Sequence, residues 1–244
     1  MRNNMSQSKR FGESLPNWTP PRWPDVSILD GRYARLEALC AEAHAADLHR
    51  ANEADDAIWD YLPYGPFHSA ATYHKWVRSV TEGLKDPMFY AVREKTSGRA
   101  QGVLSFLRIA PEAGSIEVGN INFVPILQRT PAATEAIFLL TDWLFGAGYR
   151  RFEWKCDALN MPSRRAAQRF GFSYEGVFRQ AAVVKGRNRD TAWFAMIDKE
   201  WPAMRSAYEA WLALSNFDAD GKHRERLGDM TRLVRVSDDP ALRA

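Results

Sequence analysis

The sequence contains little cysteine, with Cys40 and Cys156 the only two among 244 residues. The pair lacks the spacing of a zinc site, and two cysteines do not build a disulfide framework. Since Cys40 falls in a helix-like segment and Cys156 in a strand-like one, we expect both to be reduced core residues. The five histidines have no ligand spacing either, because His44 and His49 are five residues apart, off the preferred helical step. The sequence therefore predicts no metal site.

Net charge and long apolar runs are equally scarce. The 33 Lys and Arg residues barely outnumber the 30 Asp and Glu residues, which gives a formal net charge of +3. So weak a positive field does not favour a nucleic-acid duplex, and we expect no nucleic-acid partner. No apolar run approaches the roughly 20 residues that span a bilayer, and residues 1–10 lack the apolar stretch of a signal peptide. These absences predict a cytoplasmic protein without a membrane partner.

Hydrophobic residues, by contrast, are plentiful. They make up 45% of the chain and include 9 Trp, 13 Phe and 8 Tyr, which is ample for a buried core. Residues 1–24 are polar and rich in Pro, and we interpret them as an extended arm that packs, if at all, through Trp18 and Trp23. Residues 25–215 are predicted to form one domain. Charges dominate the remainder, so residues 216–244 are expected to form a mobile or loosely docked tail.

Hydrophobic periodicity divides the central part of the chain into strands and helices. Alternating apolar residues predict strands at 32–37, 88–93, 102–108, 115–124, 151–156, 177–184 and 191–197. Apolar stripes, start signals and stop signals predict helices at 41–54, 69–84, 131–145, between Asn160 and Gly171, and after Pro202. The resulting order is β-α-α-β-β-β-α-β-α-β-β, which indicates an α/β (α+β) protein.

The most distinctive stretch runs from Asn160 to Gly176, where a basic helix follows a strand and ends at Gly171 before another strand begins. This stretch, with the order of elements over residues 25–202, resembles the GNAT superfamily of acyl-CoA N-acetyltransferases. The resemblance is strongest over residues 128–200 and points to the branch of the RimJ and RimL type of ribosomal-protein N-terminal acetyltransferases. It implies a mixed, mostly antiparallel sheet flanked by helices, with acetyl-CoA as cosubstrate and a primary amine as acceptor.

In that family a Gln/Arg-x-x-Gly-x-Gly/Ala loop opens the long helix and binds the coenzyme A pyrophosphate. The matching stretch here is Gln128–Ala133, with Pro131 in place of the first Gly. A helix start offers an anion free N–H groups and the positive end of the helix dipole. Thr130 suits the N-cap, Pro131 suits the first helical position, and the two alanines after it still donate. Arg129 supplies a guanidinium that fits phosphate. The alternative is that this stretch only starts a well-capped helix.

Asn160 follows the strand that precedes the basic helix. The resemblance implies that Asn160 hydrogen-bonds the pantetheine arm, whose amides both donate and accept, as an amide side chain can. The alternative is an ordinary turn Asn before a helix start. Arg164 and Arg165 are interpreted as a solvated helix face. The expected coenzyme contacts are Phe123, Val124, Gln128, Arg129, Thr130, Ala132, Ala133, Asn160 and Ser163.

Attack of an amine on a thioester requires a base, an oxyanion donor and a proton for the leaving thiolate. Glu117 matches the acidic residue common in this branch and is a candidate base; the alternative is an exposed strand carboxylate. A backbone N–H within residues 121–123 is the expected oxyanion donor. Ala167 replaces the Tyr that protonates the thiolate in many family members, so Ser163 is the next candidate, with helix capping as its alternative. Because Cys156 has no His nearby in sequence, direct attack in a ternary complex is favoured over an acetyl-enzyme.

The acceptor is indicated only by an aromatic loop at residues 58–67. Trp59, Tyr61, Tyr64 and Phe67 form either a lid over an acceptor pocket or, more commonly for such loops, a plug that closes a core. The loop and the near-neutral charge favour a small amine over a peptide N-terminus. A noncatalytic acyl-CoA-binding module is a further alternative, motivated by Pro131 and the missing Tyr. The terminal hairpin is compatible with a homodimer but does not require one.

Overall fold

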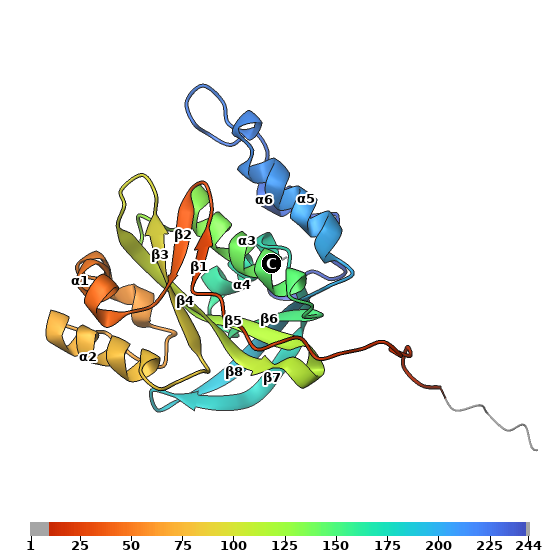
Figure 1. The fold of residues 1–244 in the computed structure, drawn as a ribbon, viewed down its shortest axis with the longest axis horizontal. Coiled ribbons are helices and arrows are strands. Elements are labelled where there is room, and N and C mark those ends of the chain that lie inside the picture. The colour runs from red at the N-terminus through yellow and green to blue at the C-terminus, as the bar shows by residue number, and fades with distance from the viewer. Residues whose placement is uncertain (1–9, 243–244) are drawn as a thin grey trace, which may run out of the picture.

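An eight-stranded sheet with the order β1-β2-β3-β4-β5-β6-β8-β7 organises the computed structural model, which describes residues 10–242 (Figure 1). The strands are Ile28–Asp30 (β1), Ala34–Ala38 (β2), Met88–Glu94 (β3), Ala100–Ala110 (β4), Ser115–Phe123 (β5), Arg151–Asp157 (β6), Ser173–Val184 (β7) and Arg187–Ile197 (β8). The pair β5 and β6 is parallel, and the other neighbouring strands run antiparallel. The predicted mixed, mostly antiparallel sheet is confirmed.

Helices cover both faces of this sheet (Figure 1). They are Ala41–Asn52 (α1), Ala70–Thr81 (α2), Pro131–Gly146 (α3), Met161–Arg169 (α4), Trp201–Leu212 (α5) and Leu227–Arg232 (α6), with a short 3-10 helix at Asp56–Trp59 (η1). One hydrophobic cluster joins α1 and α2 to β3 and β4, and a larger one joins α3, α4 and α5 to the opposite face. The protein is therefore built as helices, sheet and helices in three layers.

The alternating sequence of β6 determines which of its side chains lie on each face of the sheet. Phe152, Trp154 and Cys156 are buried in the cluster below α3 and α4, whereas the alternate residues Glu153 and Lys155 lie on the α1 face. Successive strand side chains point to opposite faces, so one alternating run supplies both an apolar core and a row of charges. This row enters the candidate site described below.

The predicted elements are all present, with ends displaced by a few residues. The sequence patterns do not predict β1 or α6. β1 has only three residues, too few for an alternating pattern to be visible. α6 has six residues inside a charged segment and lacks a side-chain cap, so neither periodicity nor a start signal marks it.

Residues 216–242, expected to form a mobile or loosely docked tail, include α6 and pack against α4 and α5. Leu227 in α6 is 1% exposed and Asp239 is fully buried. The segment packs on α4, where the Thr231 hydroxyl donates to the Arg169 carbonyl at 3.1 Å. Its charge density suggested solvation, but Asp239 of this segment forms an ion pair with Arg164 on α4. Residues 243–244 lie outside the described residues.

The N-terminal arm docks where the sequence predicts it. Trp18 lies below the Arg150 guanidinium at 5.5 Å, and the Tyr149 hydroxyl donates to the Arg22 carbonyl at 3.0 Å. Trp23 is 40% exposed and contributes less than Trp18. The first nine residues of the predicted arm lie outside the described residues.

Candidate active site

Strands β5 and β6 separate halfway along their length. Their parallel pairing joins Ser115–Val118 to Arg151–Trp154 and stops there, although β5 continues to Phe123 and β6 to Asp157. The backbone groups of β5 that face β6 beyond Val118 therefore lack a strand partner. This split contains residues 121–123, where the sequence analysis expects an oxyanion donor.

A β-bulge at Asn120 turns β5 at the split. Asn120 has a φ of 51°, and the register with β4 shifts at this point. The Asn120 amide donates to Ser105 Oγ at 2.9 Å and accepts from the Tyr64 hydroxyl at 3.2 Å, while Ser105 donates to the Gly119 carbonyl at 3.2 Å. The sequence analysis missed this bulge, although a Gly-Asn pair inside a strand is a signal for one.

The start of α3 lies at the end of β5 and keeps free donors. Thr130 Oγ accepts from Ala133 N–H at 3.1 Å, as expected of an N-cap, so Ala133 is not free. Among the described residues, no hydrogen bond uses the backbone N–H of Arg129 or Ala132. Arg129 has a φ of 63°, a left-handed conformation that helps to turn successive N–H groups towards one side. Two backbone donors and one exposed guanidinium thus remain for an anion.

Two further expected coenzyme contacts, Gln128 and Val124, form hydrogen bonds within the protein. The Gln128 side chain donates to the Phe123 carbonyl at 2.8 Å and so braces the loop. Val124 is buried; its N–H donates to the Gln101 carbonyl at 3.3 Å and its own carbonyl accepts from Gln128 and Leu127. A backbone contact of Val124 with the coenzyme has no free group to rely on.

Asn160 caps α4 and retains a donor. Its Oδ1 accepts from the Ser163 N–H at 3.0 Å, and no described residue accepts a hydrogen bond from its NH₂ group. Ser163 Oγ accepts from the Trp154 indole at 3.0 Å, and its hydroxyl lies beside the Cys156 thiol. The alternative in which Ser163 caps the helix is wrong, because Asn160 provides the cap. Both residues stand at the β6 side of the split.

The interpretation of Arg164 and Arg165 as a solvated face holds only for Arg165, which is exposed. Arg164 is 6% exposed and forms a bidentate ion pair with Asp239, with both N–O distances 2.6 Å. It also donates to the Ala158 carbonyl at 2.7 Å. The partner lies 75 residues away in sequence, so helical spacing could not reveal it. This contact fixes the turn between β6 and α4 that carries Asn160.

Glu117 is a buried carboxylate at the base of the split. It is 3% exposed, so the alternative of an exposed strand carboxylate is wrong. Arg108 and Lys155 contact its Oε2 at 2.7 and 2.9 Å, and Lys155 in turn lies over the Trp193 ring at 3.8 Å. No described hydrogen bond reaches Oε1, which is not fully enclosed. Two cations therefore hold one carboxylate oxygen, and the other has no hydrogen-bond partner among the described residues.

Neither the Cys156 thiol nor the side chain at position 167 supplies a catalytic group at neutral pH. Burial raises the pKa of the Cys156 thiol to about 11, so the thiolate that acts as nucleophile is scarce. Cys156 is a free, buried thiol as expected, whereas Cys40 is free but only half-buried. Ala167 is fully buried and has no polar atom beyond its backbone.

The aromatic loop lies across the α1 side of the split. Trp59 is 2% exposed and packs edge-on against Phe67, so the plug interpretation is correct for this part of the loop. Tyr61 is 42% exposed, and its hydroxyl donates to the Leu159 carbonyl at 3.2 Å beside α4. Lys185, at the tip of the β7–β8 hairpin, donates to the Trp59 carbonyl at 2.8 Å. The loop thus connects both sides of the split with the terminal hairpin.

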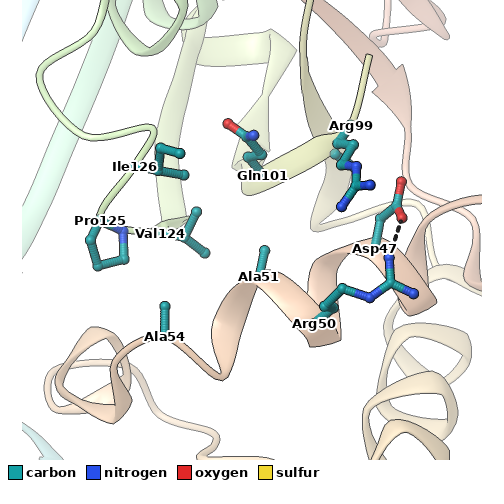
Figure 2. A pocket seen from close by; sticks show the side chains of 10 residues that line it. Asp47, Arg50, Ala51, Ala54, Arg99, Gln101, Val124, Pro125 and Ile126 are labelled. Atoms are coloured by element: carbon teal, nitrogen blue, oxygen red, sulfur yellow. Dashed lines mark hydrogen bonds and ion pairs between the residues drawn. The ribbon is translucent and has the colours of Figure 1, made fainter. Parts of the chain in front are cut away.

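A separate cavity of about 400 Å³ lies between the C-terminal part of α1 and the loop after β5 (Figure 2). Figure 2 shows Val124 and Ile126 across from Ala51 of α1 and Ala54 just beyond it, and the ion pair of Arg50 with Asp47. The Arg50–Asp47 distance is 3.5 Å. Val124 is the one expected coenzyme contact that lines it. The cavity is therefore distinct from the split between β5 and β6.

Neither a metal cluster nor a membrane span is present within residues 10–242. No group of three or more His, Cys, Asp or Glu side chains is arranged to hold a metal ion there. No helix in this part of the chain is both long and apolar enough to cross a bilayer.

Comparison with known proteins identifies the family. A family model described as an acetyltransferase (GNAT) domain matches residues 34–173, more than half of the chain. The chain therefore belongs to the GNAT acetyltransferases, a family that uses acetyl-CoA as cosubstrate. Among curated proteins, none matches the chain.

Solved structures agree with this assignment. The crystal structure of a GCN5-related N-acetyltransferase from Brucella melitensis is 46% identical, has a TM-score of 0.87, and the match covers 89% of this chain and 100% of the other. A probable GNAT-family acetyltransferase from Chromobacterium violaceum is 42% identical, with a TM-score of 0.74 and coverage of 80% and 98%. An acetyltransferase from Salmonella typhimurium that modifies the N-terminal serine of ribosomal protein L7/L12 is 24% identical, with a TM-score of 0.60 and coverage of 70% and 98%. That last likeness concerns the fold alone.

Proposed function

We propose that this protein transfers the acetyl group of acetyl-CoA to a primary amine by direct attack in a ternary complex. The observation that carries the proposal is the split between β5 and β6, flanked by the starts of α3 and α4. The unpaired edge of β5 can hydrogen-bond the amides of a pantetheine arm as a sheet edge binds an extended peptide. Asn160 supplies a further donor to that arm, and the start of α3 with Arg129 suits the pyrophosphate.

The reaction needs three groups around the thioester carbon. Glu117 Oε1 accepts the proton of the acceptor ammonium, directly or through water, so that the free amine attacks the carbonyl. A backbone N–H within residues 121–123 donates to the developing oxyanion. When the carbon–sulfur bond breaks, the Ser163 hydroxyl donates a hydrogen bond to the leaving thiolate. The thiolate takes up the second proton of the attacking nitrogen, directly or through water, and Glu117 then releases the first proton to solvent. The raised pKa of Cys156 supports direct transfer over an acetyl-enzyme.

A small amine is the acceptor that the structure favours. Hydrogen bonds from Tyr61, Tyr64 and Lys185 tie the aromatic loop across the α1 side of the split, where the acceptor must enter. An aromatic loop fixed at these three points leaves less room for a folded protein as acceptor than for a small molecule. A peptide N-terminus is the second candidate, because Leu159 is 76% exposed at the rim and offers a peptide side chain an apolar contact.

The test combines calorimetry with turnover. Acetyl-CoA is titrated into wild-type protein, an Asn160→Asp variant and an Asn17→Ala variant, whose substitution is on the exposed arm. Turnover is then measured on a panel of amino acids, polyamines and short peptides by release of free thiol. Micromolar binding with turnover supports the proposal. Binding without turnover on any amine indicates the noncatalytic module, and no binding refutes the coenzyme site.

A further inference from the structure

Arg169, in the last turn of α4, is a half-buried cation without a carboxylate partner. One of its guanidinium nitrogens, Nη2, donates to Thr134 Oγ at 3.1 Å. Within residues 10–242 no ion pair involves this guanidinium, and its other nitrogens are neither hydrogen-bonded nor fully buried. Most of its five N–H donors therefore remain open.

The surroundings compensate this charge only in part. The rings of Phe170 and Trp211 each lie 5.1 Å from the guanidinium carbon, and such contacts favour a cation. Neither ring carries a formal charge. Burial lowers the pKa of Arg169, and the charge of Arg129 acts in the same direction. A desolvated cation next to a second cation is costly unless an anion joins them.

Arg169 and Arg129 reach the start of α3 from different elements. Arg129 belongs to the loop that ends at the N-cap Thr130, and Thr134, which Arg169 contacts, lies one turn further along. Arg129 is exposed and forms no ion pair among the described residues. The Arg169 guanidinium thus contacts the first turn of α3, and Arg129 lies next to the N-cap of this helix, whose start also has free N–H donors and the positive end of the helix dipole.

The C-terminal segment holds Arg169 in this position. Thr231 donates to the Arg169 carbonyl at 3.1 Å, and Arg235 donates to the neighbouring Gln168 carbonyl at 2.7 Å. These contacts hold the backbone at the end of α4, while the bond to Thr134 and the rings of Phe170 and Trp211 hold the Arg169 side chain. A group held in place before its ligand arrives loses less conformational entropy on binding.

We propose that Arg169, with Arg129, binds a phosphate group of coenzyme A, so that the end of α4 and the C-terminal segment form part of the coenzyme site. This inference rests on the proposed function. Coenzyme A carries two kinds of phosphate, the pyrophosphate and the 3′-phosphate of its ribose, and a guanidinium fork fits either.

The test measures affinity for coenzyme A and for 3′-dephospho-coenzyme A by calorimetry on wild-type protein and on Arg169→Met. Arg78→Met is the control, because it removes one positive charge from an exposed site on α2. Loss of a charge-assisted hydrogen bond predicts that Arg169→Met binds coenzyme A about 10-fold to 100-fold more weakly. If Arg169→Met weakens the binding of coenzyme A but not that of 3′-dephospho-coenzyme A, Arg169 contacts the 3′-phosphate. Equal weakening with both ligands assigns it to the pyrophosphate.

Two further measurements keep the outcome clear. Circular dichroism shows whether Arg169→Met folds. If it does not, Arg169→Lys takes its place, because this variant retains the charge and should keep part of the affinity. A crystal structure of the wild-type complex should place a phosphate oxygen about 3 Å from an Arg169 nitrogen. Unchanged affinity in folded Arg169 variants, or a complex in which no phosphate meets Arg169, overturns this inference alone. If wild-type protein binds neither ligand, the proposed function fails as well.

Discussion

Substitution of Asn160 separates two roles that one side chain combines. Its Oδ1 caps α4 through the Ser163 N–H, and its NH₂ group is the proposed donor to the pantetheine arm. In Asn160→Ala both are lost, so we expect a loss of about 1 kcal/mol in the free energy of unfolding, typical of a missing N-cap. In Asn160→Asp the cap acceptor remains and only the donor is lost. Its stability should stay within a few tenths of a kcal/mol of the wild type, since Asp caps as well as Asn.

The two variants should therefore differ in stability but agree in binding. One missing hydrogen bond of about 0.5 to 1.5 kcal/mol weakens coenzyme A binding about twofold to tenfold in both. Denaturant unfolding measures the first quantity and calorimetry the second. If Asn160→Asp binds coenzyme A as tightly as the wild type, Asn160 is a helix cap alone and the reasoning about the pantetheine arm is refuted.

Three further predictions concern charged side chains. Glu117→Gln should lower kcat about 100-fold to 10,000-fold, as loss of a general base does, with little change in coenzyme affinity; steady-state rates check this against Glu112→Gln, an exposed control. Asp239→Asn leaves a buried cation on α4 unpaired and should cost about 3 to 5 kcal/mol of unfolding free energy, measured by denaturant titration. The Arg93 guanidinium lowers the pKa of Glu37 to about 2, so its stabilising contribution is complete above pH 4.5 and is lost as pH falls towards 2. The stability difference between wild type and Glu37→Gln should therefore shrink over that range.

Each of these three predictions has a result that would contradict it. If kcat of Glu117→Gln equals that of the control, Glu117 is not the general base. An Asp239→Asn loss below about 1 kcal/mol, as at exposed ion pairs, means that the tail is not anchored by this contact. A stability difference for Glu37→Gln that is independent of pH contradicts the lowered pKa.

Most of the helices and strands, and the family, could be predicted from the sequence. Alternation in β6 and the apolar stripe of α3 depend on which face of a strand or helix is buried, and that information is local. The Thr130 cap, the Pro131 start and the stretch from Asn160 to Gly171 are likewise readable within a few residues. These features located both helix starts that flank the split.

The tertiary structure decided which distant groups meet. Arg164 and Asp239 pair across 75 residues, the bulge at Asn120 appears through its register with β4, and Arg169 reaches the start of a different helix. The sequence made Arg164 look solvated because periodicity gives the face of a residue but not its partner. A charge is tolerated inside a protein only when the fold brings a counter-charge or a ligand to it, so the roles of these residues depend on the assembled structure.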